Sequence, residues 1–169
     1  FKYIGEQIKW FEQEHSQEFL FGYEESYGCL EGTHARDKDA VVAVMALCEA
    51  AAYYRDKGIS LCEQMEKLFA EYGYFQEDLC TVTKKGVNGA KEIADVMERL
   101  RAQTPESLGG FRVLRVRDYR TGKITVKESG EVLQTGLPTS NVLYLDLEED
   151  AWCCIRPSGT EPKIKFYAG

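Results

Sequence analysis

The sequence predicts two domains, an α/β domain over residues 1–75 and an α+β domain with a mostly antiparallel sheet over residues 76–169. The first part combines helix-forming stretches with one short apolar run, which is typical of an α/β arrangement. The second part has one amphipathic stretch followed by five short segments rich in β-branched and aromatic residues. The pattern changes near residues 74–78, which marks the expected boundary.

The first domain is expected to open with an amphipathic helix, because Ile4, Ile8 and Phe11 fall on one helical face. Residues 18–21 (Glu-Phe-Leu-Phe) are expected to form a short buried strand. This strand leads into a loop, residues 22–28, that has a glycine at each end. The order is therefore helix, strand and loop.

Two further helices are expected in the first domain. Residues 40–54 are apolar except for Glu49, and a helix of this kind should be packed on most of its circumference. Ser60 and Glu63 match the capping box that begins a helix, and Gly73 matches the glycine that ends one. Only one strand is predicted here, and because a sheet needs partners we expect this domain to be incomplete.

The second domain is expected to begin with a strand over residues 79–85, followed by a helix that Asn88 caps. Apolar residues at helical spacing predict the buried face of this helix, namely Ile93, Val96, Met97 and Leu100. The strands expected after it span residues 111–119, 123–128, 141–147, 152–156 and 164–167. One helix followed by several strands favours an antiparallel sheet.

Charge and hydropathy exclude two classes of partner. The formal net charge is −7, from 21 Lys+Arg against 28 Asp+Glu, so neither nucleic acid nor an anionic membrane surface is expected as a partner. No apolar run approaches the ~18 residues that a membrane span needs, and no signal-peptide pattern opens the chain. The chain begins with Phe1 rather than Met, and we expect it to be a segment of a longer protein.

The six cysteines do not form a metal-binding pattern. They lack CxxC spacing, and the only histidines that could join them are His15 and His34, so no metal site is expected within this segment. Scattered cysteines with apolar neighbours are typical of reduced core residues in a cytoplasmic protein.

The loop over residues 156–162, Arg-Pro-Ser-Gly-Thr-Glu-Pro, joins two expected strands and carries groups that suit an anion. The guanidinium of Arg156 can hold a phosphate with two parallel hydrogen bonds. Ser158 and Thr160 offer hydroxyl donors, and Gly159 permits close approach to backbone amides. The alternative interpretation is an ordinary turn, because Pro-Ser-Gly-Thr is common turn chemistry.

The loop over residues 22–28 combines two carboxylates with a serine hydroxyl and two tyrosines. Glu24 and Ser26 could bind vicinal hydroxyls of a sugar, one accepting and the other donating. The alternative is an acidic surface loop with packed tyrosines. In the following segment, Asp37 or Asp39 is expected to cap the long helix.

Three motifs, taken in order and spacing, resemble the C-terminal half of an α-D-phosphohexomutase. They are Gly-Tyr-Glu-Glu-Ser-Tyr-Gly at 22–28, Arg-Asp-Lys-Asp-Ala-Val-Val-Ala at 36–43 and Arg-Pro-Ser-Gly-Thr-Glu-Pro-Lys-Ile-Lys-Phe-Tyr at 156–167. The resemblance covers the whole chain and is closest to the phosphoglucomutase/phosphomannomutase members. It implies part of the family's α/β third domain, which binds the sugar, followed by its fourth domain, which binds phosphate. That fourth domain has a sheet similar to that of the TATA-binding protein, with helices on one face.

Carried over residue by residue, the resemblance implies that Glu24 and Ser26 contact sugar hydroxyls and that Lys38 lies near the transferred proton. The residues implied to hold the substrate phosphate are Arg156, Ser158, Gly159 and Thr160. The family's phosphorylated serine and its Mg²⁺-binding carboxylate loop lie in the first two domains, and neither motif occurs in this sequence.

For the whole enzyme, the resemblance implies interconversion of hexose 1-phosphate and hexose 6-phosphate through a phosphoserine and a bisphosphate intermediate, with Mg²⁺ as cofactor. The segment is expected to need the missing N-terminal domains of the same chain and to be inactive alone. Two alternatives are a phosphopentomutase and a non-catalytic module that binds a sugar phosphate or a protein.

Overall fold

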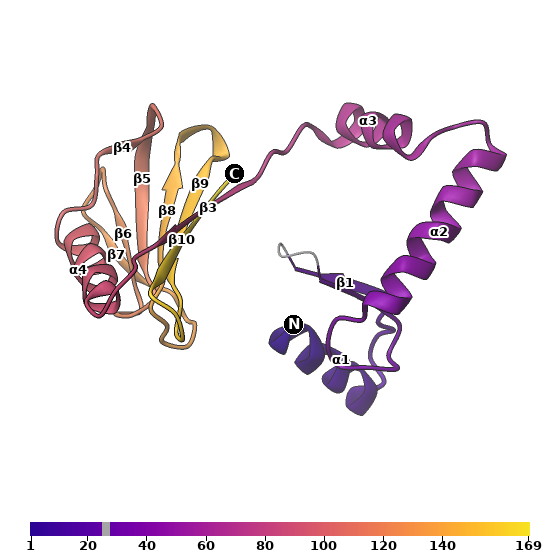
Figure 1. Cartoon of the computed structure of the whole chain (residues 1–169), viewed down its shortest axis with the longest axis horizontal. Coiled ribbons are helices and arrows are strands. Elements are labelled where there is room, and N and C mark those ends of the chain that lie inside the picture. Colours follow the sequence, from indigo (N-terminus) through magenta and orange to yellow (C-terminus); the bar gives the residue numbers. More distant parts are fainter. Residues whose placement is uncertain (25–27) are drawn as a thin grey trace. The chain divides into compact units, whose positions relative to one another are not determined.

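A computed structural model describes residues 1–24 and 28–169 of the chain. The chain divides into two compact units, Phe1–Tyr74 and Phe75–Gly169 (Figure 1). The first unit combines helices with a short hairpin, and the second combines a helix with an antiparallel sheet. This arrangement confirms the predicted mixture of an α/β and an α+β part.

The described residues of the first unit form three helices and a two-stranded hairpin. Their bounds are α1 (Lys2–Glu14), β1 (Phe21–Tyr23), β2 (Cys29–Glu31), α2 (Ala40–Asp56) and α3 (Leu61–Tyr72). The strands β1 and β2 pair antiparallel, with Tyr23 opposite Cys29. Ile8 of α1 and Leu30 of β2 are fully buried, and they form the small interior of this unit.

The strand expected over residues 18–21 was wrong in both place and burial. β1 begins at Phe21, and Leu20 and Phe21 are exposed. A Cβ on Gly22 would lie 2.9 Å from Cγ2 of Ile4, so a glycine is needed for the hairpin to lie against α1. The buried position belongs to Leu30 in β2, a strand that the sequence analysis did not predict.

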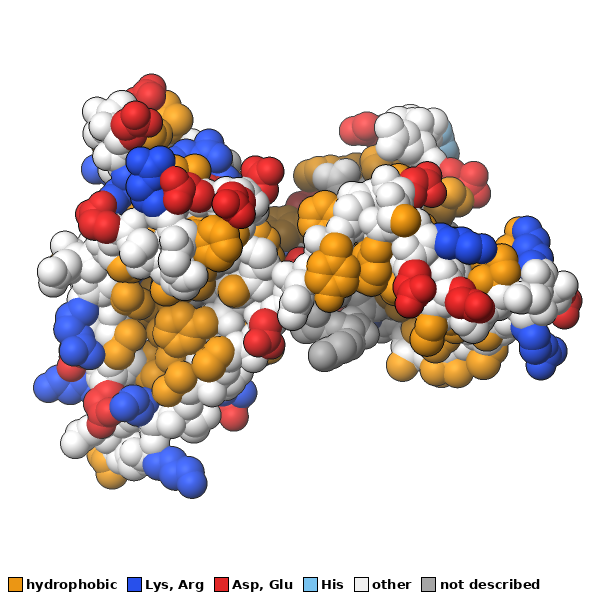
Figure 2. All heavy atoms as spheres, turned by 90° about the horizontal axis from the view of Figure 1, so that it is seen from above, with side chains coloured by type: hydrophobic (Ala, Val, Ile, Leu, Met, Phe, Trp, Pro, Cys, Tyr) orange, Lys and Arg blue, Asp and Glu red, His pale blue; other side chains and the backbone are white. Residues whose placement is uncertain are grey.

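The long helix α2 begins where expected but is not packed on most of its circumference. The Asp39 carboxylate caps it, accepting hydrogen bonds from the amides of Val41 at 2.8 Å and Val42 at 3.4 Å. Its apolar side chains, however, remain exposed across the surface of the first unit (Figure 2). Val41, Val44, Met45 and Leu47 are between 60% and 70% exposed. A short hairpin and α3 offer too little apolar surface to cover a helix of this composition.

Helix α3 follows its local sequence closely. Ser60 and Glu63 form the predicted capping box: the Glu63 amide donates to Ser60 Oγ at 3.1 Å, and the Ser60 amide donates to Glu63 Oε2 at 2.6 Å. Gly73 stands at the C-terminal cap with φ of 98°, a conformation that favours glycine.

The second unit is built on an eight-stranded sheet in the order β3-β10-β9-β8-β5-β6-β7, with β4 paired to β5. All the pairs formed by described residues are antiparallel. The bounds are β3 (Asp78–Thr83), α4 (Gly89–Ala102), β4 (Ser107–Leu108), β5 (Phe111–Asp118), β6 (Lys123–Val126), β7 (Val132–Gln134), β8 (Leu143–Leu147), β9 (Trp152–Pro157) and β10 (Lys163–Ala168). The short strands β4 and β7 were not predicted. Asn88 stands at the N-cap of α4 as expected, but its side chain makes no capping hydrogen bond.

Helix α4 covers one face of this sheet (Figure 1) and closes a hydrophobic core. Ile93 and Met97 of α4 are buried, as the helical spacing predicted. They pack with alternate residues of the strands, and the buried set on the sheet is Val113, Leu143, Leu145, Leu147, Cys153, Ile155 and Ile164. Because strand residues alternate between faces, Tyr144 and Asp146 lie on the face away from α4.

Candidate functional site

The 22–28 loop connects β1 to β2, and its two ends are held together by the backbone. The amide of Glu24 donates to the carbonyl of Gly28 at 2.8 Å. The Glu24 side chain is 27% exposed, and its carboxylate pairs with the amino group of Phe1. Ser26, the second predicted sugar contact, lies outside the described residues.

Lys38 lies against the end of this loop. A Cβ on Gly28 would stand 2.5 Å from Cδ of Lys38, so the glycine makes room for the lysine stem. The Lys38 ammonium lies 3.1 Å from Oδ1 of Asp37 and 5.4 Å from the centre of the Phe1 ring. Glu24 and Lys38 therefore both contact Gly28, Glu24 through its backbone amide and Lys38 through its side-chain stem.

The carboxylates beside Lys38 have separate roles. The Asp39 amide donates to the carbonyl of Cys29 at 2.9 Å, which ties the start of α2 to the hairpin. The pKa of Asp39 is lowered, first by the hydrogen bond with the His34 ring at 2.9 Å and then by the capping amides. The pKa of Asp37 is lowered mainly by its hydrogen bond with the Lys38 side chain. Asp39 is thus the cap, whereas Asp37 is the ionised partner of Lys38.

The 156–162 loop connects β9 to β10 and is closed by its own hydrogen bonds. The amide of Ser158 donates to the carbonyl of Lys163 at 2.8 Å. Ser158 Oγ accepts from the amides of Thr160 at 3.4 Å and Glu161 at 3.3 Å. Since its oxygen accepts these bonds, the Ser158 hydroxyl proton remains available for an acceptor outside the loop. The amide of Lys84 donates to the carbonyl of Pro162 at 2.8 Å and fixes the loop to the end of β3.

Arg156 is exposed on the face of the sheet away from α4, because its neighbour Ile155 is buried on the α4 face. Its guanidinium forms no ion pair within the described part of the chain. Gly159 is also exposed, and a Cβ built on it would meet nothing within 4 Å, so a ligand can approach its backbone closely. The loop therefore offers a cation, two hydroxyls and an open backbone stretch to an anion.

The sequence analysis missed Lys165 as a neighbour of this loop. Lys165 stands directly opposite Arg156 in the β9–β10 register, so the two cations occupy the same face of the sheet. The sequence signal for the face that Lys165 occupies is the alternation of polar and apolar residues along the strand, since alternate residues share a face. The polar positions are Lys163, Lys165 and Tyr167, and the apolar positions are Ile164 and Phe166. Two neighbouring cations raise the local potential for an anion.

The two predicted loops belong to different units. Among residues 1–24 and 28–169, no group of three His, Cys, Asp or Glu side chains could hold a metal ion. In the same residues, no helix combines the length and the apolar character needed to cross a bilayer.

Comparison with known proteins identifies relatives of the whole chain. The family model described as phosphoglucomutase/phosphomannomutase, alpha/beta/alpha domain III, matches residues 1–72. The phosphoglucomutase of Staphylococcus epidermidis is 38% identical over 167 residues, which make up 99% of this chain and 30% of that relative. The corresponding proteins of Staphylococcus haemolyticus and Staphylococcus aureus are 34% and 33% identical over the same share. The chain thus spans about 30% of the length of these relatives.

A solved structure shares the fold. The crystal structure of the exocytosis-sensitive phosphoprotein pp63/parafusin, a phosphoglucomutase from Paramecium in its open form, has a TM-score of 0.51 to this chain. The match covers 85% of this chain and 24% of that chain at 16% sequence identity. At this identity the likeness concerns the fold alone.

Proposed function

We propose that the chain belongs to the phosphoglucomutase/phosphomannomutase family and is the C-terminal segment of a phosphohexomutase, since the model of the family's domain III matches residues 1–72. The observation that carries the proposal is the relationship to phosphoglucomutases over 99% of the chain, which includes both predicted loops. The names of these relatives favour a hexose phosphate over a pentose phosphate as substrate. The proposed reaction exchanges hexose 1-phosphate and 6-phosphate through a phosphoserine and a bisphosphate.

In this proposal the first unit binds the sugar. Glu24 accepts hydrogen bonds from sugar hydroxyls, and Ser26, from the same loop, donates one. Lys38, whose stem lies against Gly28, supplies a positive charge beside the loop and a proton donor near the transferred phosphoryl group. The backbone bond from Glu24 to Gly28 and the Lys38 stem against Gly28 support placing Glu24 and Lys38 in a single site.

The second unit anchors the phosphate that is not transferred. Arg156 supplies a guanidinium that no carboxylate of the described chain neutralises, and Ser158 and Thr160 supply hydroxyls. A bisphosphate that turns round between two half-reactions needs one anchor for either phosphate. A short loop rich in donors suits this need because it recognises the phosphate and not the sugar.

Mg²⁺ is part of the proposed reaction, where it offsets charge on the transferred phosphoryl group. The described residues do not fit a Mg²⁺ site, since they contain no cluster of acidic side chains able to hold one. We therefore assign neither a Mg²⁺ ligand nor a metal-dependent step to this chain. A cytoplasmic location belongs to the same proposal, because Cys29, Cys48, Cys62, Cys80 and Cys153 are reduced thiols.

The test is an NMR titration of the chain with inorganic phosphate. We expect the amides of Ser158, Gly159 and Thr160 to shift, and the Arg156→Ala variant to lose these shifts. Arg112→Ala is the matched control, because Arg112 is an exposed arginine of β5 that pairs with Glu148. Shifts that persist without Arg156, or that vanish equally in the control, would contradict the phosphate assignment.

A further inference from the structure

The second unit contains a polar pocket that the predicted loops do not use. It has a volume of about 460 Å³ and lies where helix α4 ends, between the segment after the helix and strands β5 and β6. We call it the α4-end pocket. Its polar lining includes Thr104, Glu106, Asp118, Lys123, Thr125 and Lys127. Sites for small molecules typically measure about 300–1,000 Å³, so the pocket has the size of a small-ligand site.

The alternation of strand β6 places three polar side chains on this pocket. Lys123, Thr125 and Lys127 occupy every second position and line it, whereas Ile124 and Val126 do not. Val116, opposite Thr125 in the register, and the buried Leu143 provide an apolar floor. Because α4 ends at Ala102, the helix does not cover this part of the sheet. The result is an apolar floor with a polar rim.

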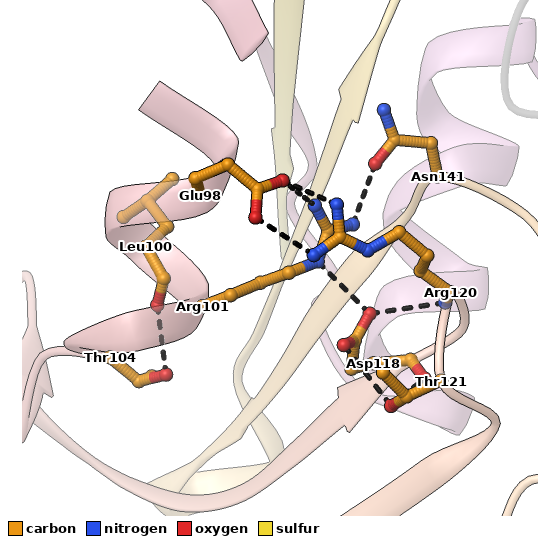
Figure 3. A network of polar contacts seen from close by, with 8 residues as sticks. All are labelled: Glu98, Leu100, Arg101, Thr104, Asp118, Arg120, Thr121 and Asn141. Carbon is orange, nitrogen blue, oxygen red and sulfur yellow. Dashed lines mark hydrogen bonds and ion pairs between the residues drawn. The ribbon is translucent and has the colours of Figure 1, made fainter. Parts of the chain in front are cut away.

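The wall of the pocket is held rigid by a network around Arg101 (Figure 3). The Arg101 side chain is only 8% exposed; its Nε donates to Oδ1 of Asp118 at 3.1 Å, and its Nη2 donates to Oδ1 of Asn141 at 2.6 Å. Asp118 also accepts from the amide of Arg120 and from the hydroxyl of Thr121, both at 3.1 Å. These bonds fix the end of α4 to the end of β5, so that little conformational entropy remains to be lost on binding.

One cation that lines the pocket, Lys123, lies opposite Asp118 in the β5–β6 register without forming an ion pair with it. Lys127 pairs with Glu106 at 2.8 Å, and Asp118 pairs with Arg101. Lys123 forms no ion pair with the part of the chain that the structure describes. Oδ2 of Asp118, which accepts one hydroxyl, can accept a second hydrogen bond, and the oxygen of Thr104 can accept as well, because its proton is donated to the Leu100 carbonyl. The pocket therefore combines a free cation with acceptors for hydroxyl groups.

From this combination we propose that the α4-end pocket binds a sugar phosphate as a second ligand site of the protein. The phosphate pairs with Lys123 and accepts from the hydroxyl of Thr125. The sugar lies over the apolar floor, and its hydroxyls donate to Asp118 and Thr104.

This pocket is distinct from the 156–162 loop. Two strands separate β6 from β9, which corresponds to about 14 Å across the sheet. The pocket also lies on the α4 face, whereas Arg156 lies on the opposite face. A ligand can therefore bind to either site, or be lost from it, independently of the other site.

An NMR titration of the whole chain with glucose 1-phosphate tests the proposal. We expect a set of shifts at Thr121, Lys123 and Thr125 that is separate from any shifts at residues 158–160. Lys123→Ala should weaken the binding of glucose 1-phosphate that these shifts report at least 10-fold. Thr125→Val, which removes only the hydroxyl, should weaken this binding less. Lys91→Ala, an exposed lysine of α4 outside the pocket, and Arg156→Ala should leave this set unchanged.

Two outcomes would overturn the second site. The first is a titration in which only residues 158–160 respond, which would leave the loop assignment standing. The second is a Lys123→Ala variant that keeps a native spectrum and binds as the Lys91→Ala control does. A titration with inorganic phosphate distinguishes recognition of the phosphate charge from recognition of the sugar. If phosphate and glucose 1-phosphate bind to this pocket with equal affinity, the assignment to a sugar phosphate is wrong.

Discussion

The two units differ in how far their apolar side chains are covered. In the second unit, α4 and the sheet enclose a core of nine buried residues from the helix and the strands, centred on Met97 and Leu145. Among the described hydrophobic side chains of the first unit, only Ile8 and Leu30 are fully buried, although α2 is the most apolar helix in the chain. Lys and Arg balance Asp and Glu in the second unit, so the whole net charge of −7 falls on the first.

This difference shows that secondary structure and burial are set by different parts of a sequence. Helices α2 and α3 form with their caps in place, because Asp39 and Ser60 act on amides only a few residues away. Burial of α2 instead needs apolar surface from elsewhere, and the described part of the first unit supplies little. The second unit contains both partners of its core, namely the helix and the strands.

The largest expected effect concerns catalysis, to which the two units are proposed to contribute two binding loops and Lys38. The chain by itself should show no mutase activity with glucose 1-phosphate, even with Mg²⁺ and a bisphosphate activator present. The reason is that the phosphoserine and Mg²⁺ motifs of the family do not occur in the sequence. A coupled assay for glucose 6-phosphate measures this, and turnover that survives exhaustive purification would overturn the proposed role of the segment.

The contrast in burial predicts a contrast in stability. Leu145→Ala should lower the free energy of unfolding of the second unit by roughly 2–5 kcal/mol, because Leu145 is only 1% exposed and would leave a cavity. Val44→Ala on α2 should change the stability of the first unit by less than about 0.5 kcal/mol, because Val44 is 60% exposed. Urea denaturation followed by NMR measures the unfolding of each unit separately. Similar losses of unfolding free energy in both variants would contradict the predicted difference between the units.

The proposed sugar loop lies in the first unit, and its removal should affect catalysis but not folding. In the full-length enzyme, Glu24→Ala should lower kcat/KM at least ~10-fold, equivalent to about 1.4 kcal/mol of transition-state stabilisation. Glu31→Ala is the control, because Glu31 is an exposed carboxylate at the end of the same hairpin. Unchanged kinetics in Glu24→Ala would favour the acidic surface loop.

These comparisons also show which features the sequence could predict. The capping box of α3, the six longer strands of the second unit and the resemblance to phosphohexomutases were predicted from local patterns and motifs, and all are confirmed. The strands β2, β4 and β7 were missed because each has only two or three residues, too few for alternation to appear. The exposure of α2 could not be predicted, since it depends on what lies around the helix.

Within the candidate sites, sequence supplied the residue types but not their neighbours. The hydrogen-bond donors of residues 156–160 could be identified from the sequence. The hydrogen bonds that Ser158 Oγ accepts from the amides of Thr160 and Glu161 could not, because they depend on the conformation of the loop. Likewise, the contact of Lys38 with Gly28 joins a loop to the segment before α2, and only the fold brings them together.

The smallest expected effect distinguishes the thiols of the two units. The expectation of core cysteines was wrong for Cys48, Cys62 and Cys80, which are exposed. It is confirmed for Cys153, which is 3% exposed in the core of the second unit. Burial, and then the neighbouring Cys154, raise the pKa of Cys153 from 9.0 to about 11, so its thiol stays protonated at pH 8. With a disulfide reagent such as DTNB, the exposed cysteines should react at once and Cys153 only after unfolding.

The same pKa shift predicts how stability depends on pH. Below pH 9 the Cys153 thiol is protonated in both the folded and the unfolded chain, so its burial contributes fully to stability. Between pH 9 and about 11 the unfolded chain loses this proton and the folded chain keeps it, so stability falls as pH rises, by at most ~1.4 kcal/mol per pH unit. A Cys153→Ala variant removes this dependence while Cys80→Ala keeps it. Denaturation curves of both variants at pH 8.5 and 10 measure the difference, and equal pH dependence would show that the Cys153 thiol is not buried in the core.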